Sequence, residues 1–228
     1  MGKRYKTVLI DADNTLLDFD AAERQALRRT MEARGLEFND QRLAEYVRIN
    51  RALWDAAHRG EIDQGYIAGE RFARFGRSLG WEGDAGAWDR DYLRALGDCP
   101  DTLPGAVELL RSLKPYCVIA LATNGLRDVR RRRLAGNPIG SYLDGVFISQ
   151  EMGVGKPRAD FFRRAMDALG AERESTVMIG DDLLSDIQGA VNAGIDSVWY
   201  APRGGESPLP TWQVASLADI PALVLGEN

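Results

Sequence analysis

Short apolar runs alternate with amphipathic helical segments through the second half of the chain, and this alternation constrains the fold more than any other feature. Each run has the length and apolar character of a buried strand. The runs are residues 118–122, 146–148, 176–179 and 197–200, and the helical segments lie near 127–134, 159–169 and 184–192. Continuous apolar runs are typical of parallel strands whose two faces are both covered. The sequence therefore predicts an α/β fold, with a Rossmann-like parallel sheet and helices on both faces.

An apolar run at residues 7–10 predicts one more strand, and a different kind of sequence follows it. Residues 20–99 contain helical patterns and no β-type alternation. The helical segments are residues 23–33, 42–58, 64–79 and 87–96. We therefore expect a core of residues 1–18 and 101–228 and an inserted α-helical subdomain of residues 19–100, which we call the cap.

The charge and composition argue against several classes of partner. The chain has 228 residues and a formal net charge of −5, which disfavours a nucleic acid or an anionic membrane surface as partner. The two cysteines, Cys99 and Cys117, have neither metal-binding spacing nor the pattern of a disulfide framework. No apolar run has the length of a membrane span, and no apolar signal core follows the first charged residues. We expect a cytoplasmic protein, a monomer or weak homodimer, with no membrane or nucleic-acid partner.

Polar residues gather where the predicted strands end, which is where a parallel sheet forms its ligand site. Asp11 and Asp13 follow the first strand and, being two residues apart, point to the same side of an extended chain. Burial of both carboxylates is costly unless a cation or solvent lies beside them. Further polar residues fall on the same rim: Thr123, Asn124, Lys156, Asp181, Asp182 and Asp186. Because oxygen ligands suit Mg²⁺, the sequence predicts a site for a phosphoryl group and a hard cation.

These residues resemble the four ordered motifs of the haloacid dehalogenase superfamily. The matching segments are Asp11-Ala12-Asp13-Asn14-Thr15, Thr123-Asn124-Gly125, Lys156-Pro157, and Gly180-Asp181 with Asp186. The resemblance covers almost the whole chain and includes a helical cap inserted after the first motif. It implies a Mg²⁺-dependent phosphomonoesterase that acts on a small-molecule phosphate ester.

The resemblance also implies roles for the residues that meet the substrate. Asp11 would be the nucleophile that forms an aspartyl-phosphate. Asp13 would be the general acid that protonates the leaving group and then the base that activates water. Thr123, with help from the backbone around Asn124, would bind a phosphoryl oxygen, and Lys156 would neutralise charge on Asp11 and the phosphate.

The metal would be held by the acidic residues of the first and last motifs. The resemblance implies that Asp11, Asp181 and the backbone carbonyl of Asp13 are the Mg²⁺ ligands. Asp186 and Asp182 would complete the acidic shell, either through water molecules or by orienting the lysine. Because dehalogenases of this superfamily lack a carboxylate at the position of Asp13, its presence favours phosphate-ester chemistry, although phosphomutases also carry it.

Substrate choice is expected to depend on the cap. Asn50 lies on the apolar stripe of the segment 42–58 and needs a partner, either another buried group or a substrate. Arg71 lies on a similar stripe, where an exposed snorkelling arginine is the alternative. The pattern around them resembles the cap of bacterial pyrimidine 5′-nucleotidases, which implies nucleoside monophosphate substrates such as UMP, dUMP and dTMP. A phosphoglycolate or sugar-phosphate phosphatase, a phosphomutase and a non-enzymatic regulator are the alternatives.

Two further features have a structural interpretation. The arginine-rich run at residues 127–133 is interpreted as a solvated helix face, because the chain as a whole is acidic. Thr15 is either a turn and helix-cap residue or a phosphate contact.

Overall fold

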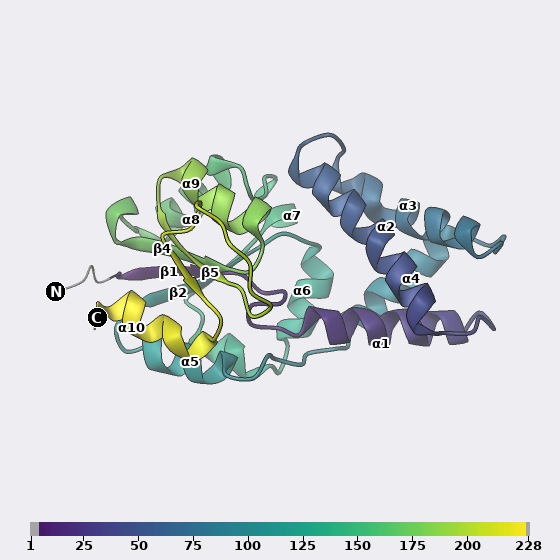
Figure 1. Cartoon of the computed structure of the whole chain (residues 1–228), viewed down its shortest axis with the longest axis horizontal. Helices are drawn as coiled ribbons and strands as arrows, with labels where there is room; N and C mark the ends of the chain where they lie inside the picture. The colour runs from purple at the N-terminus through teal and green to yellow at the C-terminus, as the bar shows by residue number, and fades with distance from the viewer. Residues whose placement is uncertain (1–4, 227–228) are drawn as a thin grey trace. The chain divides into compact units, whose positions relative to one another are not determined.

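The computed structural model, which describes residues 5–226, contains two compact units (Figure 1). One unit runs to Phe19 and resumes at Pro100, and the other is Asp20–Cys99. The sequence predicts the two boundaries at 18/19 and 100/101. Below, the first unit is called the core and the second the cap, and each is described by itself.

The core contains a six-stranded parallel sheet within residues 5–226, so the predicted α/β class is confirmed. The strands are β1 (Thr7–Ile10), β2 (Val118–Thr123), β3 (Gly145–Ile148), β4 (Thr176–Gly180), β5 (Asp196–Tyr200) and β6 (Trp212–Val214). Their order is β3-β2-β1-β4-β5-β6. Strand β6 is not among the strands predicted from the sequence, because its three residues are too few to produce a recognisable pattern.

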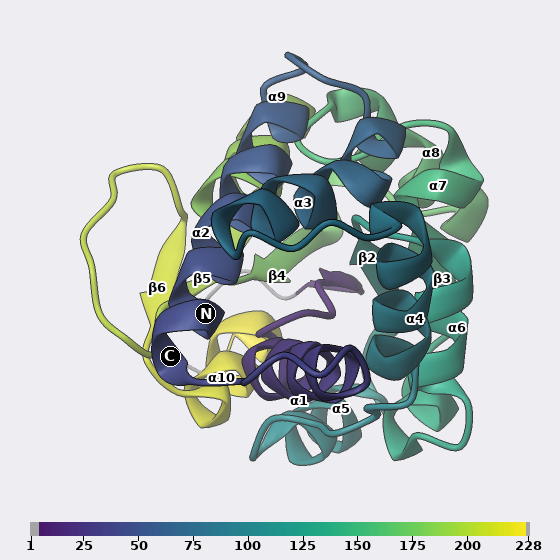
Figure 2. The ribbon, with the colours of Figure 1, turned by 90° about the vertical axis from the view of Figure 1, so that its right-hand side faces the viewer.

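Helices cover both faces of the sheet, as predicted. Alternate residues of β1 point to opposite faces: Val8 and Ile10 pack with Leu110, whereas Leu9 packs with Phe161 and Phe162. The helices of the first face are α5 (Ala106–Leu113) and α10 (Ile220–Leu225), and those of the second are α8 (Ala159–Leu169) and α9 (Gln188–Ala193). Figure 1 and Figure 2 show these pairs on opposite sides of the sheet.

Shorter elements complete the core. They are α6 (Arg127–Leu134), α7 (Ser149–Met152), the 3₁₀ segments Pro138–Tyr142, Arg173–Ser175 and Leu217–Asp219, and a π-helical turn at Leu183–Ile187. The sequence predicts one helix near 184–192, but the structure has the π-helical turn followed by α9. Wider turns of this kind are frequent at functional sites because they redirect a side chain.

A tight turn follows β1. Asn14 takes the left-handed conformation with φ 54°, which asparagine tolerates better than most residues. The backbone N–H groups of Leu16 and Leu17 donate to the carbonyl of Ala12, and the Asn14 side chain accepts from the N–H of Phe19. This turn fixes the backbone of Asp13 beyond the carboxyl end of the strand.

The cap contains the helical segments that the sequence predicts. They are α1 (Phe19–Glu32), α2 (Asp40–His58), α3 (Gln64–Ser78) and α4 (Ala85–Gly97). Asn39, Asp63 and Asp84 cap the last three by accepting from backbone N–H groups in their first turns. The predicted single helix at 64–79 is broken at Ala68 and Gly69, because Gly69 has a φ of 80°.

Aromatic rings fill the interior of the cap. Phe72 of α3 stacks on Trp88 of α4 with ring centroids 4.9 Å apart, and Tyr46 of α2 stacks on Phe72 at 5.3 Å. Such pairs add packing energy beyond the area they bury. Within residues 5–226, no helix is both long enough and apolar enough to cross a bilayer.

Candidate active site

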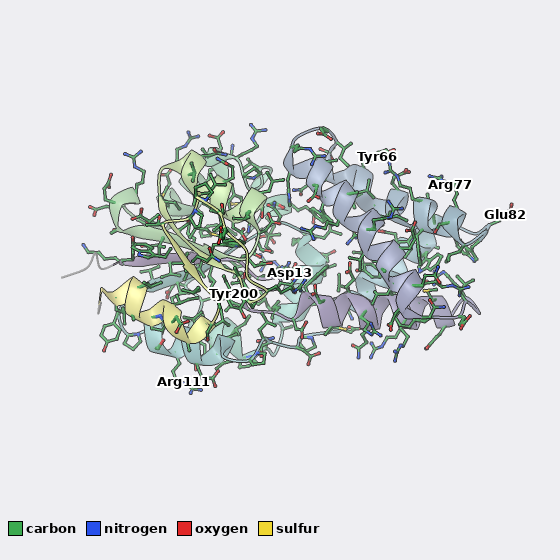
Figure 3. All side chains as sticks on the ribbon, viewed as in Figure 1. Asp13, Tyr66, Arg77, Glu82, Arg111 and Tyr200 are labelled. Atoms are coloured by element: carbon green, nitrogen blue, oxygen red, sulfur yellow. The ribbon has the colours of Figure 1, made fainter. Side chains whose placement is uncertain are left out.

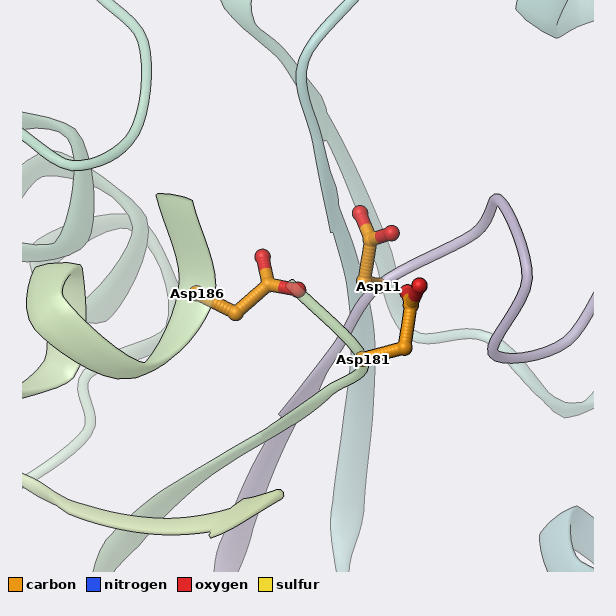
Figure 4. A group of neighbouring side chains, drawn as sticks. All are labelled: Asp11, Asp181 and Asp186. Carbon is orange, nitrogen blue, oxygen red and sulfur yellow. The ribbon is translucent and has the colours of Figure 1, made fainter. Parts of the chain in front are cut away.

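The predicted carboxylates meet at the point where the strand order reverses. β1 and β4 are neighbours in the sheet, and the chain continues outward from them in opposite directions. Ligands bind at such points because the loops that follow the two strands separate and leave a crevice. Carboxylate oxygens of Asp11, Asp181 and Asp186 lie within 4.8 Å of one another. Figure 4 shows Asp11 and Asp181 side by side, with Asp186 reaching toward them from the turn after β4.

Lys156 is buried between two of these carboxylates. Its Nζ donates to Asp11 Oδ1 at 2.6 Å and to Asp186 Oδ1 at 2.5 Å. Burial alone would lower the pKa of Lys156, but the negative charges of Asp11 and Asp186 raise it above its ordinary value. The ammonium group therefore stays charged and ties the end of β1 to the segment after β4.

The loop after β2 holds the backbone of Lys156 in place. Asn124 Nδ2 donates to the carbonyl oxygen of Lys156 at 2.8 Å, and Asn124 Oδ1 accepts from the N–H of Lys156 at 2.9 Å. Thr123 is buried, and its hydroxyl donates to the carbonyl of Asn124 at 3.2 Å. The resemblance implies that the backbone around Asn124 helps to bind the phosphoryl group, and this stays a prediction. The amide side chain of Asn124 bonds to the backbone of Lys156.

The turn after β4 presents Asp186 to the lysine. Asp182 Oδ1 accepts from the N–H groups of Leu184 and Ser185 and so caps this turn. Asp186 Oδ2 accepts from the N–H of Asp182 at 3.1 Å. Asp186 approaches so closely that a Cβ on Gly180 would lie 2.1 Å from its Oδ2, which explains why β4 ends in glycine.

Asp181 lies in an environment that disfavours a bare carboxylate. Burial, followed by the negative charges of Asp186 and Asp11, raises the pKa of Asp181 to about 8. The hydroxyl of Thr15 donates to Asp181 Oδ1 at 3.0 Å, so Thr15 contacts the acidic cluster. Trp199 Nε1 donates to the Asp181 carbonyl oxygen at 2.8 Å.

The cluster fits a hard divalent cation. Its donors are carboxylate oxygens, which Mg²⁺ prefers. Within residues 5–226, the second oxygens of Asp11 and Asp181 accept no hydrogen bond, whereas both oxygens of Asp186 do. Asp11 and Asp181 are therefore the carboxylates best able to hold a metal. A carbonyl contribution from Asp13 stays a prediction.

Two arginines that the sequence analysis interpreted as solvated bind the Asp13 carboxylate. Arg130 Nη1 and Nη2 donate to Asp13 Oδ1 and Oδ2 at 2.9 and 2.5 Å, and Arg133 Nη1 donates to Oδ1 at 2.6 Å. Figure 3 shows Asp13 beyond β1, beside α6. Burial alone would raise the pKa of Asp13, but the two guanidinium groups lower it. The solvated-face interpretation is therefore wrong for Arg130 and Arg133, and it is right for Arg131, which is exposed.

The cap residues singled out by the sequence have partners inside the cap. Asn50 Nδ2 donates to Glu23 Oε1 at 2.9 Å, and both side chains are buried. Arg71 Nε donates to Asp89 Oδ1 at 2.7 Å, and each side chain is 5 % exposed. The structure thus provides the buried partner that was one alternative for Asn50. It also shows that Arg71 is not an exposed snorkelling residue.

Comparison with known proteins identifies relatives along nearly the whole chain. A profile described as haloacid dehalogenase-like hydrolase matches residues 5–194. Pyrimidine 5′-nucleotidase PynA of Streptococcus pneumoniae is 38 % identical over 222 residues, covering 95 % of this chain and 93 % of that protein. Pyrimidine 5′-nucleotidase YjjG of Escherichia coli is 30 % identical over 225 residues, covering 97 % of this chain and 98 % of that protein.

A solved structure is similar across both units. The crystal structure of the HAD-hydrolase YfnB from Bacillus subtilis, described as bound to magnesium, has a TM-score of 0.92 and 30 % identity to this chain. The match covers 97 % of this chain and 99 % of the other.

Proposed function

The chain belongs to the haloacid dehalogenase-like hydrolases and is a phosphomonoesterase, and on this premise we propose that it hydrolyses pyrimidine nucleoside 5′-monophosphates through an aspartyl-phosphate on Asp11. The observation that carries the mechanism is the position of Asp11. One of its oxygens is held by Lys156 at 2.6 Å, while the other accepts no hydrogen bond from residues 5–226. An oriented carboxylate with one free oxygen is suited to attack phosphorus.

In the first half of the reaction, the free oxygen of Asp11 attacks phosphorus and the ester P–O bond breaks. Asp13 gives its proton to the departing alkoxide oxygen. Lys156 keeps its positive charge beside Asp11 and offsets the negative charge that gathers on the phosphoryl oxygens.

In the second half, Asp13 removes a proton from a water molecule whose oxygen attacks the same phosphorus. The bond between phosphorus and Asp11 breaks, inorganic phosphate leaves and the free carboxylate is regenerated. Asp13 thus ends this half with the proton that it took from water.

We propose Mg²⁺ as the cofactor, held by Asp11, Asp181 and the backbone carbonyl of Asp13. When bound, the ion would supply positive charge beside the transferred phosphoryl group. Asp186 would keep Lys156 in position, and Asp182 would hold the turn that carries Asp186.

The nucleotide part of the proposal is supported by the two relatives described as pyrimidine 5′-nucleotidases, which match nearly the full chain. Asn50 and Arg71 stay our predicted substrate contacts in the cap. In Asn50→Ala, a higher KM for UMP with an unchanged KM for an aryl phosphate would support a nucleotide contact. An equal effect on both would remove Asn50 from the list.

Phosphate release across a substrate panel tests the proposed function. The panel contains UMP, dUMP, dTMP, purine monophosphates, phosphoglycolate and sugar phosphates, each with and without Mg²⁺. We expect Mg²⁺-dependent release with preference for the pyrimidine nucleotides. Preference for phosphoglycolate or a sugar phosphate would contradict the nucleotide assignment, and equal release after chelation of Mg²⁺ would contradict the cofactor.

A further inference from the structure

Three N–H groups from two buried arginines hold the Asp13 carboxylate. Arg130 engages both oxygens through a two-pronged contact, and Arg133 adds a third N–H to Oδ1. The side chains of Arg130 and Arg133 are 5 % and 1 % exposed, and that of Asp13 is 28 % exposed. Planar guanidinium groups fix the plane and the rotation of a carboxylate, which a lysine ammonium does not do.

The arginines are themselves held in place. They lie three residues apart on α6, so both point to the same side of that helix. Arg133 Nη2 also donates to the carbonyl of Asp18 at 3.3 Å. The turn after β1 and helix α6 are therefore joined through Asp13.

The arrangement restricts the Asp13 carboxylate more than a single ion pair does. Arg130 and Arg133 both donate to it, and both guanidinium groups are buried. The proposed phosphate ester binds at the end of β1, the strand that Asp13 follows.

We propose that Arg130 and Arg133 are positioning residues that hold the Asp13 carboxyl group so that its Oδ2 atom transfers the proton. Oδ1 accepts from both arginines and Oδ2 accepts from Arg130 alone, which leaves Oδ2 with a lone pair for transfer. Oδ2 gives its proton to the ester oxygen as the P–O bond breaks. It later takes a proton from the attacking water. The inference rests on the acid–base role proposed for Asp13.

The test exploits the different needs of two leaving groups. An alkoxide from a nucleotide must be protonated as it leaves, whereas 4-nitrophenolate leaves without a proton. In Arg130→Lys, which keeps the charge and loses the two-pronged contact, we expect kcat/KM for UMP to fall about 10- to 100-fold, part of the ~10²–10⁴-fold that acid–base catalysis supplies. We expect kcat/KM for 4-nitrophenyl phosphate to change less than about 3-fold, because kcat/KM reports the steps up to the aspartyl-phosphate and this leaving group needs no acid.

Three comparisons accompany this variant. Asp13→Asn should show the same selective loss, and Asp13→Asn combined with Arg130→Lys should be no worse than Asp13→Asn alone, since groups that act as a unit are not additive. Arg131→Lys is the matched control, because Arg131 lies on the same helix, is exposed and pairs with Glu151. Thermal unfolding of each variant is measured first, and Arg133→Lys replaces Arg130→Lys if the latter does not fold.

The possible results separate clearly. An equal loss of kcat/KM on both esters, no loss on either, or additive losses in the double variant would each overturn the positioning role. Wild-type protein that releases no phosphate from either ester would contradict the proposed function itself. An Asp13→Asn variant with full activity on UMP would contradict the acid–base role of Asp13, whatever the arginine variants do.

Discussion

Both units bury charged side chains, but they balance the charges differently. In the cap, Arg71 and Asp89 form a one-to-one pair at 2.7 Å, and each side chain is 5 % exposed. In the core, Asp11 and Asp186 share Lys156, and a carboxylate oxygen of Asp181 lies within 4.8 Å of carboxylate oxygens of the other two aspartates. The cap pair is complete as it stands, whereas the core cluster carries excess negative charge.

This difference separates a structural arrangement from a functional one. A closed buried pair contributes little over an apolar pair, yet removal of one partner is severely destabilising. Carboxylates that crowd together store repulsion until a cation binds, and such strained sites are typical of active centres. The two clusters should therefore respond in opposite ways when one charge is removed.

The largest expected effect is on catalysis in Asp11→Asn. An amide cannot form the aspartyl-phosphate, so turnover should fall by about 10³-fold or more. Stability without metal should stay the same or rise, because one crowded charge is gone. Asp128→Asn, whose aspartate is 82 % exposed, is the control and should leave both quantities unchanged. If Mg²⁺-dependent hydrolysis of an aryl phosphate survives in Asp11→Asn, the nucleophile is misassigned.

The opposite response is expected in the cap. Asp89→Ala leaves the Arg71 guanidinium buried without its carboxylate, so the free energy of unfolding should fall by about 3–5 kcal/mol. Asp91→Ala is the matched control: Asp91 also pairs with an arginine, Arg34, but is 51 % exposed, so its loss should cost under about 1 kcal/mol. Urea unfolding followed by circular dichroism measures both. Equal losses would show that the buried pair is no more important to folding than the exposed one.

The clustered carboxylates of the core could be predicted from the sequence, whereas the partners in the buried ion pairs could not. Asp11, Asp13 and Asp181 could be predicted because each follows a recognisable apolar strand, and parallel topology brings strand ends together. Arg130 and Arg133 could not, since their burial depends on Asp13, more than a hundred residues away in the chain. Their three-residue spacing matches that of an ordinary solvated face, and only the tertiary structure shows which side of α6 is buried. Asp89 was missed as the partner of Arg71 for the same reason.

The crowding predicts an unusual pH dependence for the metal-free protein. The pKa of Asp181 is raised from 3.8 to about 8, so the folded state binds a proton that the unfolded state releases between these values. The stabilisation is complete below pH 4 and is lost as pH rises through 8. Asp181→Asn should flatten this decline, by roughly 1–3 kcal/mol across the range.

Chemical denaturation in the presence of a chelator, at a series of pH values, measures the decline. Addition of Mg²⁺ to the wild type should raise stability most at the high-pH end, where Asp181 is ionised and can bind the ion. Asp98→Asn serves as the control because the altered aspartate lies in the cap, at the end of α4. A slope that is identical in wild type and Asp181→Asn would show that Asp181 is an ordinary carboxylate and that the cluster is not strained.

The smallest expected effect concerns how the core fixes the backbone of Asp181. Trp199, which is 7 % exposed, donates through Nε1 to the Asp181 carbonyl oxygen at 2.8 Å. Trp199→Phe removes this donor and leaves a buried carbonyl unpaired, so stability should fall by about 1–3 kcal/mol. The Mg²⁺ concentration for half-maximal activity should rise severalfold because the Asp181 carboxylate is less well fixed. Within residues 5–226, the group of neighbouring acidic side chains that could hold a metal is the one in the core, so this coupling between stability and metal affinity is expected there. Trp212→Phe, in the neighbouring strand β6, is the control: it should lower stability without changing the Mg²⁺ concentration for half-maximal activity. If the two variants behave alike, the hydrogen bond from Trp199 contributes to folding only and has no role in the metal site.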